Sequence, residues 1–386
     1  MSTRSIQAKR RSSRFGCEGL EPRALLSTLG SAPPTAEVHA LATSTPRYVA
    51  GRSPLLPYLP TTPQVTASTS TPSSGDLNPY GVAVVPANFP KSGLLQPGDT
   101  LVSNFNGPGG LQGTGTSIVR VTPGGTSTLF ARAPVGTGLA AVGVLSRGFV
   151  VAGSVPSTDG TSATAGAGSL FFFDRKGQVV GQYTNAALLN GPWDLTVVDR
   201  GATASIFVSN VLSGSVTRVN VDVPSLGSTV VVRSVTEIAS GYAHRGDPAA
   251  FELGPTGVAF DARNGTLYVA STADNAVYAV GNALGAKSSR GTGRVVYSDP
   301  AHLHGPLGLA LAPNGDLIAA NGDAVNPDPA QPSTLIEFTP RGRFVGQLQV
   351  STSPGAAFGL SVTTRNRVTT LAAVDDALNQ LDLFTV

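Results

Sequence analysis

Asn78-Pro79-Tyr80-Gly81-Val82-Ala83 is the first of six similar phrases, each a turn of small residues that leads into an apolar strand. The equivalent positions are 51 to 63 residues apart and are Pro79, Leu139, Pro192, Pro255, Pro306 and Ala357. A period of about 40–50 residues with added loops is typical of a β-propeller with one four-stranded blade per copy. The sequence therefore predicts an all-β fold over residues 76–386, a six-bladed β-propeller of four-stranded antiparallel blades.

Each copy continues with further short runs rich in Val, Ile, Phe and Thr, which are typical of strands. Turn dipeptides such as Asn264-Gly265 and Asn314-Gly315 link these runs and supply the positive φ that tight hairpins need. The sixth copy ends at Val386 after its third strand. We expect the β-prone segment 64–69 to complete this blade and close the ring, because an open ring would leave an unpaired edge.

Charge and composition exclude several classes of protein. Residues 1–30 carry six basic and two acidic side chains, so the other residues hold 20 basic and 21 acidic groups. A domain without excess positive charge does not predict a nucleic-acid partner. No apolar run is long enough for a transmembrane segment. The only cysteine, Cys17, precedes the repeats, so a disulfide framework is excluded. About 300 residues of propeller can bury a large core. We expect a monomer.

The N-terminal region differs from the repeats. Residues 1–30 form a basic leader, predicted to be disordered, that lacks the long apolar core of an ordinary secretion signal. Its segment Leu20-Glu21-Pro22-Arg23-Ala24-Leu25-Leu26-Ser27 resembles the "LEPR-x-LLS" leader of exported planctomycete proteins. That resemblance implies an extracellular or cell-envelope location, and a basic disordered tail is the alternative. Residues 31–75, rich in Ser, Thr and Pro, read as a spacer with at most one strand, at 64–69.

The repeats also resemble a known superfamily. Gly254–Asp261 followed by Leu267–Tyr278, and the similar unit Val208–Val219, resemble NHL-repeat propellers and the SMP-30/gluconolactonase-like group. The resemblance spans residues 78–386 and implies architecture. Propellers of this kind include scaffolds, binders, lactonases and lyases, so function has to be argued from a site.

One candidate site comprises the loops between the second and third strands, which open around the central channel. They carry side-chain oxygens at Asn104, Asn210, Asp274, Asn275, Asn321, Asp323, Asp375 and Asp376. Gluconolactonase-like enzymes hold a divalent cation in this region, so the resemblance implies Ca²⁺ or another divalent cation at Asn104, Asn210, Asp274, Asn321 and Asp375. The first inner strand, however, lacks the Glu that those enzymes place there. The alternative is that these side chains cap their own turns.

A second candidate site surrounds the only tryptophan. Four copies place glycine two residues after the equivalent position, whereas the third copy has Asp194 there, beside Trp193. We expect the Asp194 carboxylate to project toward the channel mouth. The turns before the fourth and fifth inner strands carry His244, His302 and His304, which are candidates for ligand or metal binding because propeller lyases use histidine on this face. Solvated loop histidines are the alternative.

These observations predict an exported or envelope-associated propeller that binds a protein, a small molecule or a carbohydrate at the channel mouth. The second hypothesis is a metal-assisted lactonase or lyase at the same mouth. Catalytic residues stay unassigned, because no nucleophile–base order, phosphate loop or carboxylate pair is visible.

Overall fold

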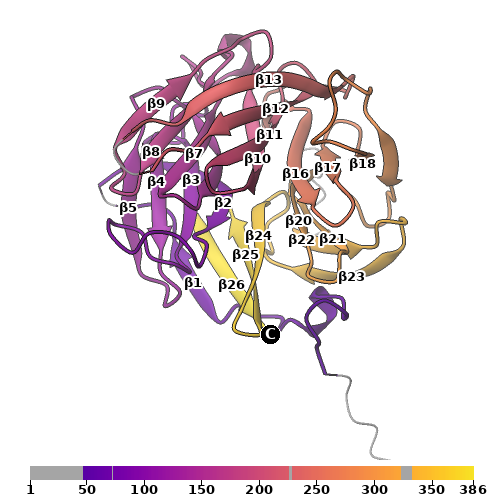
Figure 1. Cartoon of the computed structure of the whole chain (residues 1–386). Helices are drawn as coiled ribbons and strands as arrows, with labels where there is room; N and C mark the ends of the chain where they lie inside the picture. Colours follow the sequence, from indigo (N-terminus) through magenta and orange to yellow (C-terminus); the bar gives the residue numbers. More distant parts are fainter. Residues whose placement is uncertain (1–46, 72, 226–227, 323–332) are drawn as a thin grey trace, which may run out of the picture. The chain divides into compact units, whose positions relative to one another are not determined.

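The structure is a computed structural model that describes residues 47–71, 73–225, 228–322 and 333–386. These residues form six four-stranded antiparallel blades in a ring (Figure 1). The helices in this part of the chain are two 3₁₀ turns, η1 (Leu56–Tyr58) and η2 (Ser162–Thr164). The predicted all-β, six-bladed propeller is confirmed.

The first three blades are built from strands in chain order, starting with the strand nearest the channel. Blade 1 is β2 (Leu77–Val84), β3 (Thr100–Asn106), β4 (Ser117–Val121) and β5 (Ser127–Arg132). Blade 2 is β6 (Leu139–Leu145), β7 (Phe149–Ser154), β8 (Ser169–Asp174) and β9 (Val179–Tyr183). Blade 3 is β10 (Pro192–Asp199), β11 (Thr203–Asn210), β12 (Ser215–Asp222) and β13 (Val231–Ser240).

A short hairpin, β14 (Arg245–Asp247) and β15 (Phe251–Leu253), is inserted between blades 3 and 4. Blade 4 is β16 (Pro255–Asp261), β17 (Thr266–Ser271), β18 (Ala276–Val280) and β19 (Arg294–Tyr297). Blade 5 is β20 (Pro306–Leu311), β21 (Leu317–Asn321), β22 (Thr334–Phe338) and β23 (Phe344–Gln349). Blade 6 is β24 (Ala357–Arg365), β25 (Val368–Asp375), β26 (Gln380–Thr385) and β1 (Val65–Ser68).

Blade 6 closes the ring with strands from distant parts of the chain. Strand β1 pairs antiparallel with β26, with Val65 opposite Leu383 and Ala67 opposite Leu381, and Figure 1 shows the two strands side by side. The inner strand of blade 6, β24, in turn contacts the inner strand of blade 1, β2. The segment 64–69 therefore supplies the outer strand that the sixth copy lacks.

The chain that precedes β1 packs on the propeller. Leu55, Leu56 and Leu59 are buried in a cluster with side chains of blades 5 and 6. The backbone N–H groups of Leu55 and Leu56 donate to the carboxylate of Glu337 at 2.8 and 2.7 Å. The compact unit accordingly begins at Arg47, within the stretch that the sequence presents as a spacer. The leader 1–30 lies outside the described residues, and none of the helices that the structure describes could span a membrane.

The inner strands approach one another too closely for a side chain at one position. A Cβ on Gly81, Gly257, Gly308 or Gly359 would collide with a backbone carbonyl of the next inner strand. For Gly81 the distance from that Cβ to the Ala140 oxygen would be 2.5 Å. The glycine repeated in the sequence therefore sets the spacing of the inner strands. Apolar clusters fill the interfaces between neighbouring blades.

We expect β1 to be required for closure. A chain that starts at residue 47 keeps β1, whereas one that starts at residue 70 loses it and exposes the edge of β26. The first should melt close to the full chain, and the second about 10 °C or more lower, or aggregate, because several kcal/mol of pairing and packing are removed. Equal melting temperatures for the two truncations, measured by circular dichroism, would contradict the role of β1.

The Glu337 carboxyl should make stability depend on pH. Burial raises its pKa from 4.5 to about 7, against the opposing effect of the Leu55 and Leu56 N–H groups. Because the folded pKa is raised, the stabilisation is complete below about pH 4.5 and is lost as the pH rises through 7. The melting temperature should thus fall between pH 5 and pH 8, and Glu337→Gln should flatten part of that fall. An unchanged pH profile in the variant would refute this assignment.

Candidate ligand-binding site at the channel mouth

A cavity of about 500 Å³ opens where the inner strands begin and the second strands end. Since both sets of strand ends meet at the same end of the channel, the cavity draws residues from several blades. We call it the mouth pocket. It is lined by Asn78, Tyr80, Phe105, Asn106, Gly110, Gln112, Trp193, Ala249, Ala250, Leu307, Pro354, Gly355, Phe358 and Asp376.

Aromatic rings form the floor of the mouth pocket. Trp193 contacts Tyr80 and Phe105 at centroid distances of 5.5 and 5.1 Å, and Tyr80 contacts Phe358 at 6.0 Å. Three of these rings come from equivalent positions of the repeat, namely Tyr80, Trp193 and Phe358. Each lies just before the inner-strand position that is glycine in four blades. Tilted and edge-on contacts of this kind are favourable beyond the apolar area they bury. The floor is therefore a rigid apolar surface across the channel.

The inserted hairpin β14–β15 adds one more ring to this floor. Phe251 contacts Phe105 at 5.2 Å and stacks on Trp193 at 6.3 Å. Its φ is +67°, a value that costs a bulky residue energy and persists only where packing holds it. The hairpin also places Ala249 and Ala250 on the rim of the mouth pocket. The insertion thus narrows one side of the mouth.

The polar side-chain groups of the pocket are three amides, one carboxyl, the Tyr80 hydroxyl and the Trp193 indole N–H. Asp376 is the only charged side chain among the lining residues, and burial together with the neighbouring Asp375 raises its pKa to about 7. The amides belong to Asn78, Asn106 and Gln112.

Two polar atoms of the lining residues lack a hydrogen-bond partner. Asn106 Oδ1 and the indole Nε1 of Trp193 are both buried, and neither meets a partner within the described chain. Buried polar atoms are normally paired, so an unpaired acceptor and donor in two lining residues mark positions where water or a ligand would complete the bonding.

Asp194 lies deeper than the sequence led us to expect. Asp194 lines a second cavity of about 230 Å³ farther along the central channel, which is enclosed by the inner strands of blades 1, 3, 4, 5 and 6. Oδ2 accepts the backbone N–H of Val258 at 3.2 Å, and Oδ1 accepts that of Leu195 at 2.8 Å. Burial raises the Asp194 pKa to about 7 despite these bonds. The side chain stands at the position that is glycine in four other blades, and Asp194 is absent from the lining of the mouth pocket.

The three histidines lie outside the lining of the mouth pocket. The His302 ring stacks on Phe344 of the outer strand β23 at 3.8 Å, and Nδ1 is 2.7 Å from Asp299 Oδ2. His304 donates its backbone N–H to Asn321, and His244 precedes the inserted hairpin. Of the five residues proposed around the tryptophan, Trp193 alone lines the mouth pocket.

The candidate metal ligands lie near the ends of second strands, one in each blade except blade 2. They are Asn104, Asn210, Asp274, Asn321 and Asp375. The Asn210 amide donates to Leu188 O at 3.3 Å, and the Asn321 amide donates to His302 O at 2.5 Å. Leu188 and His302 each lie four residues before the first proline of their own inner strand. This repeated amide bond ties the incoming loop to its blade, across about 20 residues of sequence, and so differs from the capping of its own turn that the sequence left open.

The other members of this set also bond within their blades. Asn104 donates to Ser117 Oγ at 3.1 Å, Asp274 accepts from Ser271 Oγ at 2.7 Å, and Asp375 accepts from Leu378 N at 3.3 Å. Asp323 falls outside the described residues. In the part of the chain that is described, no three His, Cys, Asp or Glu side chains form a group that could hold a metal ion.

Several pocket residues were absent from the sequence-based candidates. Tyr80 and Phe358 share the repeat position of Trp193, so aligning the six copies would have revealed them. Phe251 lies in an insertion without a counterpart in other blades, and no sequence signal marks it. Asp376 was among the loop residues that the sequence analysis named. That it alone of those that the structure describes lines the mouth pocket depends on the direction in which each turn points its side chains.

No family model and no curated protein sequence matches this chain. Solved structures with a similar fold include a gluconolactonase from Xanthomonas campestris, at 16% identity and a TM-score of 0.50, covering 83% of this chain and 88% of that one. Regucalcin from Agrobacterium tumefaciens, a calcium-binding protein, is similar at 14% identity and a TM-score of 0.48, covering 84% and 95%. A virginiamycin B lyase from Staphylococcus aureus is similar at 12% and 0.47, covering 83% and 99%. The gluconolactonase, at a TM-score of 0.50 and 16% identity, is similar in fold alone.

Asp194 should be a structural residue. Replacing it with glycine leaves the Val258 N–H without its acceptor and a gap between the inner strands, so we expect a loss of about 1–3 kcal/mol in unfolding free energy. Asp194→Asn retains one oxygen acceptor and should lose less. Urea denaturation followed by circular dichroism measures both values. Wild-type stability in Asp194→Gly would mean that the carboxylate does not support the blade interface.

Proposed function

We propose that this protein is a binding module that takes a carbohydrate or similar polyhydroxylated molecule in the mouth pocket. The observation that carries the proposal is an aromatic floor in one cavity with unpaired polar atoms, the Trp193 indole N–H and Asn106 Oδ1. A volume of about 500 Å³ is within the range of small-molecule sites.

The lining suits the two faces of a sugar. The apolar C–H face of a pyranose ring packs on aromatic side chains, whereas its hydroxyls both donate and accept hydrogen bonds. The amides of Asn78, Asn106 and Gln112 offer donors and acceptors, and Asp376 adds a strong acceptor when ionised. Since basic side chains are absent from the lining, the pocket favours neutral over anionic sugars.

We extend the proposal to the location of the protein. The resemblance of Leu20–Ser27 to the leader of exported planctomycete proteins supports export or attachment to the cell envelope. A module exposed outside the cell meets polysaccharide there, so location and ligand class agree.

The second candidate function is a lactonase or lyase acting at the same pocket. It is favoured by Asp376, whose raised pKa of about 7 suits a general acid or base near neutral pH. The solved structures of similar fold include a gluconolactonase and a lyase. A divalent cation fits this hypothesis less well, because the five candidate ligands bond within separate blades. Asp376 would therefore carry the proton transfer in this alternative.

Trp193 offers a direct test, because it is the only tryptophan and it lines the pocket. We expect neutral oligosaccharides drawn from a panel of bacterial and plant glycans to change its fluorescence. Asp376→Asn should weaken binding about tenfold, the effect of losing a charge-assisted hydrogen bond of about 1.4 kcal/mol. Glu237→Gln, which removes one carboxylate from the outer strand β13, is the matched control and should bind as the wild type does.

The same proteins distinguish the two functions. A fluorescence response without turnover of gluconolactone supports the binding module. Turnover that Asp376→Asn abolishes, with a pH dependence centred near 7, supports the enzyme. Absence of any response across the panel would refute carbohydrate binding at the mouth pocket.

A further inference from the structure

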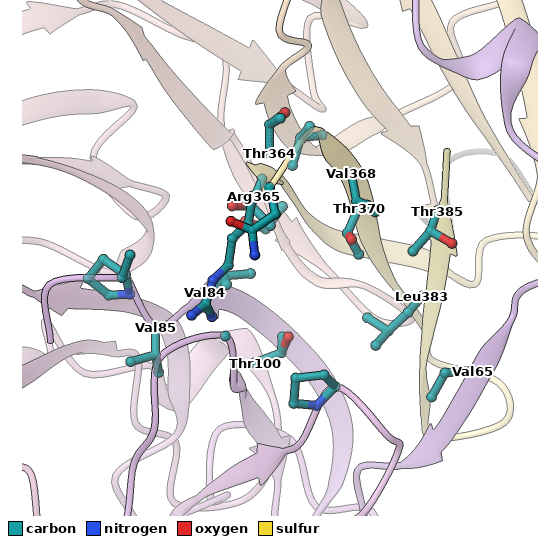
Figure 2. A pocket seen from close by; sticks show the side chains of 18 of the residues that line it. Val65, Val84, Val85, Thr100, Thr364, Arg365, Val368, Thr370, Leu383 and Thr385 are labelled. Carbon is teal, nitrogen blue, oxygen red and sulfur yellow. The ribbon is translucent and has the colours of Figure 1, made fainter. Parts of the chain in front are cut away.

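A second large cavity lies at the seam between blades 6 and 1, away from the mouth. Its volume is about 690 Å³, and it shares no lining residue with the mouth pocket. The walls come from the far end of β2, the tip of the β24–β25 hairpin and the last strand pair β26–β1. Figure 2 shows Val84 and Thr100 on one side, and Thr370, Leu383 and Val65 on the other. We call this cavity the seam groove.

The walls of the seam groove are predominantly apolar. Val65, Val84 and Val362 line it while remaining partly exposed, and Val368 is 48% exposed. The polar side chains between them are mostly threonines, whose methyl groups add to the apolar area. Partly exposed valines in a concave site retain area that an apolar ligand can bury, at about 25 cal/mol per Å².

Arg365 is the only charged side chain that lines this groove. It reaches from blade 6 toward Val84 of blade 1 (Figure 2). Its Nη1 donates to Pro97 O at 2.8 Å. Gly98 permits this approach, since a Cβ there would lie 2.8 Å from Nη1. A guanidinium has five N–H donors, and this is its one hydrogen bond to the described residues. No carboxylate of the described chain forms an ion pair with it.

The hairpin that carries Arg365 ends in a tight two-residue turn. Its two central residues, Asn366 and Arg367, have φ of +51° and +69°, the signs that a two-residue type I′ turn requires. Arg365 and Val368 face each other across this turn as a cross-strand pair. The turn therefore fixes a cation and an apolar side chain together on the rim of the groove.

We propose that the seam groove binds an amphipathic carboxylate, a medium-chain fatty acid or a molecule of similar form. The chain lies against the valines, and the carboxylate pairs with the free N–H groups of Arg365, for which a planar guanidinium is well suited. The groove and this ligand are complementary in charge as well as in polarity. Arg365 has no carboxylate partner in the described chain, so it favours a ligand with an anionic head group over one with a neutral or cationic head group.

The test uses the full chain and decanoate below its micelle concentration, with binding followed by ligand-observed NMR. 1-Decanol is the control that keeps the alkyl chain of decanoate without its charge. Acetate is the control that keeps the carboxylate without the long alkyl chain. We expect decanoate to bind at least ten times more tightly than either. Arg365→Gln should reduce decanoate binding to the level of decanol.

Arg367→Gln is the matched control, because it removes the same charge from the same turn at a residue that does not line the groove. It should bind decanoate as the wild type does, and so should Asp376→Asn, since the mouth pocket is separate. Val368→Asp, at a half-exposed position that tolerates a polar side chain, should weaken binding by changing the wall. This second variant keeps the test decisive even where Arg365→Gln unfolds.

Three results would overturn the proposal. The first is absence of decanoate binding to the wild type. The second is equal binding by Arg365→Gln or Val368→Asp and the wild type. The third is an equal loss in Arg365→Gln and Arg367→Gln, which would show a general effect of surface charge.

Discussion

The close approach of neighbouring inner strands governs the geometry of the channel. Gly81, Gly257, Gly308 and Gly359 permit backbone contact across four of the blade interfaces. Where blade 3 carries Asp194 instead, the side chain fills the space and bonds to Val258 N, the counterpart of the N–H groups that approach glycine elsewhere. Because the backbones of neighbouring inner strands are in contact at this position, the residue just before it has a fixed place around the channel.

That fixed place determines the character of the mouth pocket. Tyr80, Trp193 and Phe358 stand at equivalent positions in three blades, so the ring gathers aromatic side chains that are far apart in sequence. Phe251 joins them from an insertion, at the expense of a positive φ. The resulting floor is apolar, whereas the polar groups come from the strands β2 and β3 (Asn78 and Asn106) and from loops (Gln112 and Asp376). The mouth pocket therefore combines apolar and polar groups, because several blades each contribute part of its lining.

The seam between blades 6 and 1 is the one interface at which strands from both ends of the chain meet. Closure through β1 protects the edge of β26, and a groove of about 690 Å³ lies beside this strand pair, between blades 6 and 1. Arg365 spans that groove through a single hydrogen bond to Pro97 O. The seam is therefore both a structural closure and the site of the proposed second ligand.

The sequence by itself determined the number of blades, the strand order and the segment that closes the ring, because these follow from a repeated pattern of turns and alternating residues. It also singled out Trp193. Only the tertiary structure decided that Asp194 bonds between blades, that Asn210 and Asn321 hold incoming loops, and that His302 stacks on an outer strand. Side-chain direction at strand ends depends on the twist and spacing of neighbouring blades, which no local pattern of residues encodes.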